Sequence, residues 1–447
     1  MKRGKFKILG ITILRVKELR GGSLYLLFGI PIFFTHCPFN SVRMDLLLND
    51  SLDTKHLDRK ILSIVNEIPT FMENSASVDG IVILASELYD SGGHTECIKN
   101  IVSGMPEQCK MTLLLTRKDW TLDNCMKARE IAKYSEICGV EYHGARWRKQ
   151  LTQMFGNIVT LSPKAVVVFI HMDDVFGASL LAMLKKHTDI KILFFNHASH
   201  YPALGMSFCD LILEGTATTE AITKEQRGFD NTRVIGLPCL PESELPTFSA
   251  DEIMAKRKQL GIPEGGICTM SGAASYKFFD NGRSPYFEMI KRLLQRNENL
   301  FHVVITDMSK NERGIVDIIF ADSSKNRLIV IPASPDYRIL FKCADVFIDS
   351  FPVSSALTQI DLISMRIPNV VKRNSENPLW DFSEYMPVNY RYAFEDVTDM
   401  EQGIEDLLQS AIERNKVADE NYTYFLNNFE GVKWCKNLID LIEECNG

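Results

Sequence analysis

The chain has 447 residues, of which 45% are hydrophobic and 24% charged, so it is long enough for two globular domains. Its formal net charge of -7, from 50 basic and 57 acidic residues, argues against nucleic acid as a partner, because that binding depends on a basic surface. The eleven cysteines are dispersed without a CxxC pair, which argues against a disulfide or zinc framework and indicates a cytoplasmic protein with reduced thiols.

The N-terminal end predicts a β-hairpin. Residues 8–14 (ILGITIL) and 27–33 (LFGIPIF) share one apolar pattern, and the segment RVKELRGGS between them contains turn residues. The apolar run 24–34 is shorter than the ~20 residues that span a bilayer, and no signal-peptide cleavage site follows it. The lysines and arginines of residues 2–20 would permit peripheral contact with an anionic membrane. We expect instead a solvated hairpin packed on the first domain.

After a helical segment near 55–73, apolar β-rich runs alternate with helical patterns, which is typical of parallel α/β domains. In the first half, strands are expected at 80–86, 111–117, 165–172, 191–197, 210–215 and 232–238. In the second half, strands are expected at 266–274, 302–308, 327–333, 345–351 and 368–373, with a helix at 284–298 and three helical runs at the end of the chain.

The stretch 237–252 is rich in proline and acidic residues and lacks periodicity, so it predicts an interdomain linker. The fold class is therefore α/β with two domains. A hairpin and helix at 1–75 would belong to the first domain, whose parallel sheet would occupy 76–243. The second parallel domain would occupy 244–447 and include the C-terminal helices. Two such domains would face each other across a cleft.

Residues 345–371 predict a strand, a loop, a helix and a second strand. In such a unit a ligand lies at the loop that opens the helix, where free N–H groups and the helix dipole favour phosphate. This loop carries Ser354, Ser355 and Thr358. Asp361 follows where a carboxylate could accept hydrogen bonds from a sugar diol. The alternative is an ordinary capped helix whose aspartate complements the dipole.

Several common cofactor motifs do not occur. No GxGxxG follows the first strand of either domain, and neither GxxxxGK[ST] nor GxSxG is present. The HMDDV segment at 171–175 contains adjacent acids but not the spaced pair of a metal-held nucleotide-sugar site. We therefore expect neither a bound metal nor a cofactor.

Three segments of the second half resemble the GT-B glycosyltransferases, and most closely the O-linked N-acetylglucosamine transferases and their bacterial relatives. The first, SGAASYKFFDN at 271–281, contains Ser275 and is similar to the family's segment with an essential lysine, here Lys277. The second, 327–352, resembles the segment that reads the uridine base and contains the ASPDYR loop with Ala333, Pro335 and Arg338. The third is the loop and helix described above, which the resemblance assigns to the donor diphosphate and ribose. Together they cover about residues 265–373.

The chain departs from the family pattern at the start of that helix. Where the family has a His-Thr-Thr run, this chain has Ala356, Leu357 and Thr358. The phosphate would therefore rest on backbone N–H groups near 354–356, on Thr358 and on Lys277. The alternative for Lys277 is a surface lysine on the loop that approaches a helix.

The first half places histidines after three strands. Gly92, Gly93 and His94 lie between a strand and a helix, and the glycines would let the backbone approach a ligand closely. His171 ends another strand, and His197 and His200 follow a third. Because these strand ends meet at one edge of the sheet, imidazole could serve there as a base or as a phosphate ligand. We rank His94 first as a catalytic candidate; the alternative is a structural histidine that caps its helix.

These features predict a metal-independent hexosyltransferase whose second domain binds a UDP-hexose or UDP-N-acetylhexosamine and whose first domain binds a protein or glycan acceptor. The resemblance implies inversion at the anomeric carbon and a role in bacterial glycan or protein glycosylation. Two alternatives remain: a UDP-sugar epimerase, and a non-catalytic GT-B partner subunit that has lost donor chemistry.

Overall fold

The computed structural model describes residues 3–8, 11–19, 22–27, 30–36, 38–68, 80–90, 93–117, 125–139, 146–334 and 337–447. For residues 3–36 only the strands and their pairing are described.

The first parallel sheet has seven strands in the order β11-β10-β9-β8-β5-β6-β7. The strands are β5 (Gly80–Ala85), β6 (Lys110–Leu115), β7 (Glu136–Gly139), β8 (Ala165–Phe169), β9 (Lys191–Phe195), β10 (Leu211–Glu214) and β11 (Thr232–Val234). All neighbouring strands run parallel. The central strands β5, β8 and β9 are buried along nearly their whole length, because helices cover both faces of the sheet.

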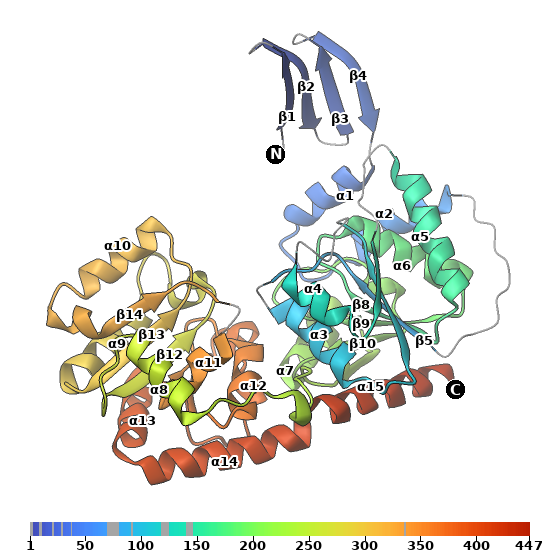
Figure 1. Ribbon diagram of the computed structural model, residues 1–447. Helices are drawn as coiled ribbons and strands as arrows, with labels where there is room; N and C mark the ends of the chain where they lie inside the picture. Colours follow the sequence, from blue (N-terminus) through green and yellow to red (C-terminus); the bar gives the residue numbers. More distant parts are fainter. Residues whose placement is uncertain are drawn as a thin grey trace.

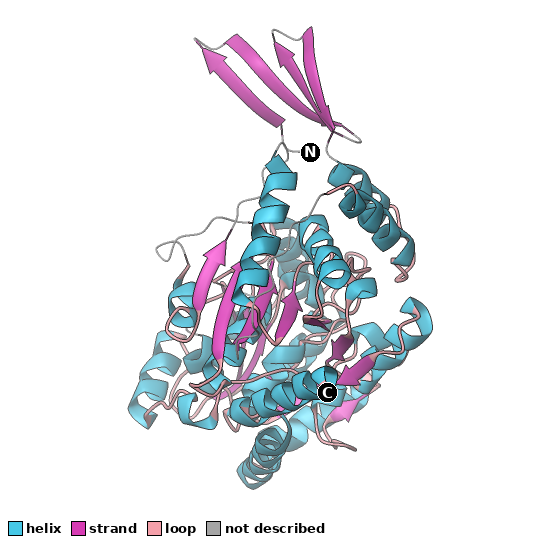
Figure 2. Ribbon diagram, turned by 90° about the vertical axis from the view of Figure 1, so that its right-hand side faces the viewer, coloured by secondary structure: helices cyan, strands magenta, loops and turns pink. Residues whose placement is uncertain are grey.

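Two groups of helices enclose this sheet. They are α1 (Pro38–Leu47), α2 (Lys55–Asn66), α5 (Trp147–Leu161) and α6 (Val175–His187) on one face, and α3 (Gly93–Gly104), α4 (Met126–Ile131) and α15 (Gly431–Asn446) on the other. On the first face, Leu57 and Leu180 share a buried cluster with Val82. On the second, Ile98 shares a cluster with Ile83. Figure 2 shows the strands enclosed by these helices.

The second parallel sheet has six strands in the order β14-β13-β12-β15-β16-β17. The strands are β12 (Ile267–Gly272), β13 (Leu300–Ile305), β14 (Leu328–Ile331), β15 (Val346–Ile348), β16 (Asn369–Lys372) and β17 (Ala393–Phe394). The helices around it are α8 (Ala250–Gln259), α9 (Pro285–Arg296), α10 (Lys310–Ile319), α11 (Tyr337–Lys342), α12 (Ala356–Ser364) and α13 (Val397–Gln409). Met289 and Met400 pack with Val304 on one face, and Leu340 packs with Val303 on the other. The predicted class, two parallel α/β sheets, is confirmed.

The last two helices connect the two halves (Figure 1). α14 (Ala411–Asn428) runs beneath the second sheet, and α15 returns beneath the first. There the Cys435 thiol donates to the Ile101 carbonyl oxygen at 3.4 Å. A Cβ atom at Gly104 would lie 2.7 Å from the Gly431 carbonyl oxygen, so the close packing of α3 on α15 requires glycine. The predicted domain boundaries themselves stay a prediction.

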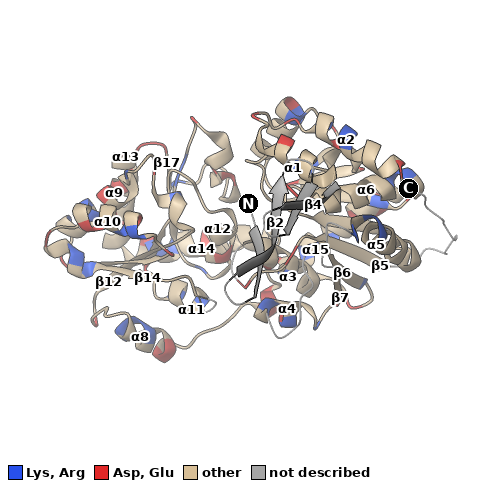
Figure 3. Ribbon diagram, turned by 90° about the horizontal axis from the view of Figure 1, so that it is seen from above, with Lys and Arg blue, Asp and Glu red and all other residues tan. Residues whose placement is uncertain are grey.

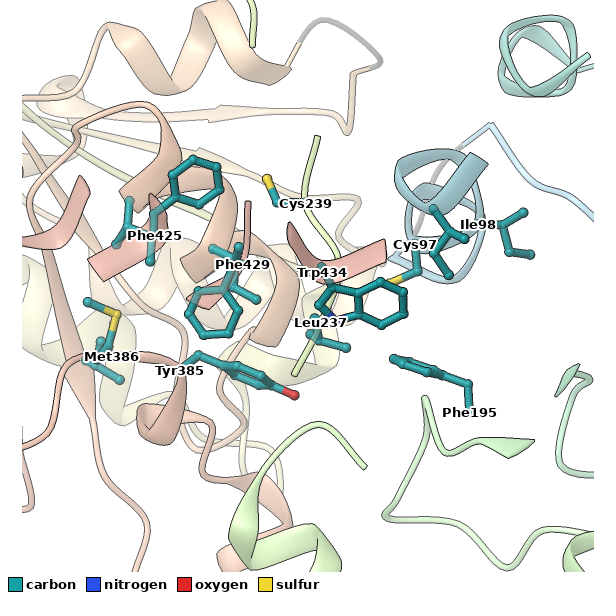
Figure 4. Close-up of a cluster of buried hydrophobic side chains, with 14 of the residues drawn as sticks. Cys97, Ile98, Phe195, Leu237, Cys239, Tyr385, Met386, Phe425, Phe429 and Trp434 are labelled. Atoms are coloured by element: carbon teal, nitrogen blue, oxygen red, sulfur yellow. The ribbon is translucent and has the colours of Figure 1, made fainter. Parts of the chain in front are cut away.

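Trp434 of α15 is fully buried at this junction. Figure 4 shows it among Leu237, which follows β11, Cys97 of α3 and Phe195 of β9. The Phe195 and Trp434 ring centroids are 6.1 Å apart. The returning helix therefore joins the hydrophobic core of the first half to the linker that leads into the second.

The N-terminal hairpin is confirmed in part, because residues 11–19 and 22–27 pair antiparallel across the predicted linker, but the sheet contains two further strands. Residues 3–36 form a four-stranded antiparallel sheet in the order β1-β2-β3-β4, not one hairpin. The strands are β1 (Arg3–Ile8), β2 (Ile11–Leu19), β3 (Gly22–Leu27) and β4 (Ile30–His36). Apolar and polar residues alternate from Leu14 to Lys17 and β2 ends at Leu19, so the first part of the stretch predicted as a turn continues a strand. The expected packing of this end on the first domain, and its contact with a membrane, depend on side chains outside the described residues.

The outer helices carry charges of both signs. Lys and Arg segments are interspersed with Asp and Glu segments on the outer helices α2, α8, α9 and α10 in the view from above (Figure 3). Within the described residues, no helix is both long enough and apolar enough to cross a membrane.

Candidate active site

A cavity of about 670 Å³ lies between the carboxyl ends of the two parallel sheets. Its walls come from the residues that follow β5, β9 and β10 in the first half and β12, β13, β14 and β15 in the second. This is where open parallel sheets bind ligands, because the loops at their carboxyl ends carry free backbone groups and helix N-termini.

Lys277 lies on the second wall, in the short 3-10 helix η6 (Ser275–Phe278) that follows β12. Its Nζ atom donates to the Ser354 carbonyl oxygen at 2.7 Å and to Ser355 Oγ at 3.4 Å. Burial lowers the pKa of Lys277 to about 8, and the negative charge of Asp349 opposes this shift. The ammonium is therefore held at the start of α12, where it can face an anion.

Asp349, which the sequence analysis did not single out, organises the loop beneath Lys277. It is fully buried after β15, and its Oδ1 atom accepts from the backbone N–H groups of Ser350 at 2.9 Å and Ser355 at 3.2 Å. Its Oδ2 atom accepts from Gln359 Nε2 at 3.0 Å and from the Ser354 hydroxyl. Burial raises the pKa of Asp349 to about 7, although the Ser354 hydroxyl and the Lys277 charge oppose the rise.

The N-terminus of α12 opens into the cavity through Ser355, Ala356, Leu357 and Thr358. The N-terminus of α3 meets it from the first half, since a Cβ atom at Gly93 would lie 3.7 Å from Leu357 Cδ2. Two helix N-termini, each with partial positive charge, therefore face the same cavity.

Asp361 reaches the cavity one turn further along α12, but both of its oxygens are engaged. Oδ2 accepts from the Tyr337 hydroxyl at 2.9 Å, and Oδ1 from Arg338 Nη2 at 3.3 Å. Burial raises the pKa of Asp361, and the Arg338 charge opposes the rise. Arg338 also donates to Glu96 Oε1 on α3 at 2.8 Å. An ion-pair network therefore crosses from the second half to the first.

Glu96 completes that network. It is almost fully buried and contacts Lys127 at 2.8 Å and Lys99 at 3.5 Å as well as Arg338. Burial alone would raise the pKa of Glu96, but the charges of Arg338, Lys127 and Lys99 hold it at about 2. Glu96 is therefore a buried carboxylate whose ion pairs link the two halves. Its pairing with Arg338 is not evident from the spacing of the residues in the sequence.

Three histidines gather at the carboxyl edge of the first sheet. The ring of His94 lies 5.2 Å from that of His171 and 4.9 Å from that of His197, measured between centroids. His94 Nε2 donates to the Phe169 carbonyl oxygen at 2.7 Å, so the side chain ties α3 to β8 rather than capping its own helix. Its Nδ1 atom is buried without a partner among the described residues.

Burial is the main electrostatic influence on these rings. It lowers the pKa of His94 to about 4 and that of His197 well below its usual value, so both are neutral near pH 7. Burial, together with the charges of Lys277 and Arg227, lowers the pKa of His200 to about 4. Because His94 donates through Nε2, the unprotonated nitrogen of the neutral ring is Nδ1.

The cavity collects most of the predicted site residues. Those that line it are Gly93, His94, His197, His200, Ser275, Lys277, Ala333, Ser355, Thr358 and Asp361. Ser354, Arg338 and His171 lie directly behind the lining, where they contact Lys277, Asp361 and His94 respectively. Gly92 and Pro335 lie outside the described residues. Asp349 could have been noticed as a carboxylate that directly follows an apolar strand.

Among the described residues, no three histidine, cysteine, aspartate or glutamate side chains are grouped as metal ligands would be.

Comparison with known proteins places the fold. No family model matches the sequence, and no curated protein matches it. A glycosyltransferase from Rickettsia africae matches 82% of this chain and 98% of its own at 12% identity and a TM-score of 0.63. Anabaena HepE, solved with UDP and glucose, matches 82% of this chain and 100% of its own at 13% identity and a TM-score of 0.62.

The O-GlcNAc transferase of Thermobaculum terrenum also matches, over 91% of this chain and 76% of its own, at 10% identity and a TM-score of 0.54. Such low identities carry information on the fold alone. The chain thus has the GT-B glycosyltransferase fold, two parallel α/β halves with a cavity between the carboxyl ends of their sheets.

Proposed function

We propose that the protein transfers a hexose or N-acetylhexosamine from a UDP-sugar to a hydroxyl group of a protein or glycan. The observation that carries this proposal is Lys277, whose half-buried ammonium lies at the N-terminus of α12 and at the wall of the cavity. The complexes of HepE with UDP and UDP-glucose support a uridine nucleotide as the ligand of this fold.

The donor diphosphate would rest against the second wall. Lys277 would supply one full positive charge, and the first N–H groups of α12 would supply hydrogen bonds and the helix dipole. Thr358 could donate its hydroxyl from the first turn. These groups would stabilise the negative charge that develops on the departing diphosphate, which is the largest electrostatic demand of the reaction.

His94 would receive the proton on the opposite wall. The acceptor oxygen forms a bond to the anomeric carbon while the bond from that carbon to the phosphate oxygen breaks, and UDP leaves with the electron pair. The hydroxyl proton passes to Nδ1 of His94, which is unpartnered within the described residues. A bound diphosphate would raise the pKa of this imidazole toward neutrality and make it a better base. Attack from the wall opposite the leaving group inverts the anomeric carbon.

The proposed reaction needs no divalent metal, because Lys277 and α12 provide positive charge at the diphosphate. The test is UDP release from UDP-glucose and UDP-N-acetylglucosamine with candidate acceptors, measured with and without excess EDTA. We expect UDP to bind by calorimetry and release to continue in EDTA. Loss of release on chelation, restored by manganese or magnesium, would contradict metal independence. Formation of an isomeric UDP-sugar without acceptor would indicate an epimerase.

A non-catalytic GT-B protein is the second candidate, and two observations favour it. Ala356 and Leu357 occupy the helix start where the resembled family has histidine and threonine, and Asp361 is engaged by Tyr337 and Arg338. This candidate predicts that the folded protein binds no UDP-sugar. Calorimetry with UDP, UDP-glucose and UDP-N-acetylglucosamine therefore separates the two candidates before any acceptor is known.

A further inference from the structure

Two exposed tyrosines belong to the segments that line the cavity from its two sides, and Tyr276 is itself part of the lining. Only four aromatic side chains of the described residues are largely exposed: Tyr89, Tyr134, Tyr201 and Tyr276. Tyr276 is 54% exposed and lines the cavity from the second half beside Lys277. Tyr201 is 52% exposed and follows His200, which lines the cavity from the first half. Burial is the main cause of a raised pKa of Tyr276, and Tyr201 is near enough to contribute to the same rise.

The backbone beneath Tyr201 is braced. Arg227 is only 1% exposed, and its Nη2 atom donates to the carbonyl oxygens of Ser199 at 2.6 Å and Tyr201 at 3.0 Å. The Tyr201 N–H donates in turn to the Ala198 carbonyl oxygen at 3.0 Å. A fully buried guanidinium therefore fixes a turn whose outermost side chain is an exposed aromatic ring. The His200 and Tyr201 ring centroids lie 4.2 Å apart, and this contact further limits the motion of the Tyr201 ring.

Tyr276 is held in a similar way on the other side. Phe278, two residues further along the chain, is fully buried in the core, and the Lys277 N–H donates to the Ala274 carbonyl oxygen at 3.0 Å. Lys277 itself is anchored on Ser354. Both exposed rings are therefore carried by fixed backbone, so a ligand that packs on them would lose little additional conformational entropy.

We propose that Tyr201 and Tyr276 form a rim that packs against a pyranose ring of the acceptor, so that the acceptor is a saccharide. This inference rests on the proposed function and specifies its acceptor. One face of a pyranose presents C–H groups that pack on an aromatic ring, while its hydroxyls need polar partners. A tyrosine ring supplies the apolar face together with a hydroxyl. Asp90 and Asp307 also line the cavity and can accept hydrogen bonds from sugar hydroxyls.

The same surface is less suited to a peptide. Among the described lining residues, Tyr276 is the only large hydrophobic residue whose side chain is mostly exposed, so the rim offers single aromatic rings rather than an extended apolar surface for a run of aliphatic side chains. A peptide added as a β-strand would need the free edge of β7, β11, β14 or β17, whereas the cavity lies at the ends of the strands. Saccharide stacking uses the two features that are present, the rings and the carboxylates.

The test uses the full chain with UDP bound. Saturation-transfer NMR would be recorded with methyl glycosides of glucose, galactose, mannose and N-acetylglucosamine, and with a serine- and threonine-rich peptide. UDP release from the UDP-sugars would be measured with the same probes. We expect at least one glycoside to receive saturation at its ring C–H protons and to accelerate UDP release. Tyr201→Ala should raise the KM for that glycoside about tenfold and change the donor KM much less.

Two matched variants isolate the ring. Tyr201→Phe keeps the ring and should keep a KM close to that of the parent. Tyr134→Ala removes an exposed tyrosine whose neighbours in the chain do not line the cavity, and it should have no effect. The inference is overturned if no glycoside binds, if the peptide alone accelerates UDP release, or if Tyr201→Ala leaves the glycoside KM unchanged. If UDP itself does not bind, the proposed function fails, and calorimetry distinguishes this outcome from failure of the saccharide rim.

Discussion

The two walls of the cavity solve different electrostatic problems. The first wall presents His94 and His197, whose burial lowers their pKa values and keeps both rings neutral near pH 7. The second wall presents Lys277. Its pKa is about 8, and the nearby Asp349 favours the charged form, so most of the Lys277 side chains are positively charged near pH 7. A neutral imidazole can take up a proton, whereas a fixed ammonium can hold an anion. The difference between the walls therefore matches the division between acceptor and donor chemistry that we propose.

The walls also differ in what supports them. His94 is fixed by one hydrogen bond to the Phe169 carbonyl oxygen, and its other nitrogen has no partner among the described residues. Asp349 accepts four hydrogen bonds and thereby fixes the loop to which Lys277 is bonded. A group that must exchange a proton needs a free atom, while a group that must hold a charge in place needs a rigid frame. Substitutions on the two walls should therefore fail in different ways.

The largest effect is expected at His94. His94→Gln keeps a side-chain donor for the Phe169 carbonyl oxygen but cannot accept the proton of a hydroxyl. We expect the transfer rate to fall about 10²–10⁴-fold, with a melting temperature close to that of the parent. The control is His187→Gln, which changes a histidine at the end of α6 outside the cavity lining. Near-normal turnover in the folded His94 variant would remove its proposed role, and His197 and His200 would be tested next.

A smaller effect, on binding rather than on rate alone, is expected at Lys277. Lys277→Met keeps the aliphatic chain and removes the charge, and a lost charged hydrogen bond costs about 1.5–3 kcal/mol. We therefore expect UDP affinity to fall roughly tenfold to a hundredfold by calorimetry. Lys258→Met on the exposed side of α8 is the matched control. Equal UDP affinity in the parent and the Lys277 variant would exclude this lysine from the donor site.

A substitution of Asp349 tests whether UDP binding at the second wall depends on the hydrogen bonds that hold its loop in place. In Asp349→Asn one acceptor oxygen becomes an NH₂ group, so at least one of the four buried donors loses its partner. We expect a loss of about 1–3 kcal/mol in the free energy of unfolding and a fall of about tenfold in UDP affinity. Asp317→Asn changes an exposed carboxylate on α10 and serves as the control. Unchanged UDP affinity would mean that the loop keeps its shape without the carboxylate.

The sequence predicted the local units of this site better than the contacts between them. Lys277 and the start of α12 follow strands whose apolar runs are evident, and both line the cavity as expected. The network of Glu96, Arg338 and Asp361 could not be predicted, because residues that are distant in sequence meet only after the two halves pack. At the N-terminus only one hairpin was predicted, because each apolar copy, 8–14 and 27–33, resembles one strand. In the structure β1 ends and β2 begins within the first copy. The assignment of roles to the site residues stays a prediction.

The smallest expected effect is the pH dependence of UDP binding, and it would show most directly that the second wall carries the charge. Burial lowers the pKa of Lys277 to about 8 in the free protein, so the ammonium loses its proton as the pH rises through that value. A bound diphosphate favours the charged form and raises this pKa, so binding near pH 8 should take up a fraction of a proton. Above about pH 7 the charge of UDP itself changes little, because the second pKa of a phosphate monoester is about 6.

UDP affinity should therefore fall about fourfold between about pH 7 and about pH 8.5, as the protonated fraction of Lys277 declines. Calorimetry in two buffers of different ionisation enthalpy would measure both the affinity and the proton uptake. The same titration of Lys277→Met should lose the contribution of the lysine and keep only that of Asp349, whose pKa burial raises to about 7. His94 and His200 do not titrate over this range, because burial lowers their pKa values to about 4. A parent protein whose UDP affinity did not change over this range would show that another group compensates the diphosphate charge. A pH dependence in Lys277→Met as steep as that of the parent would assign that role to a group other than this lysine.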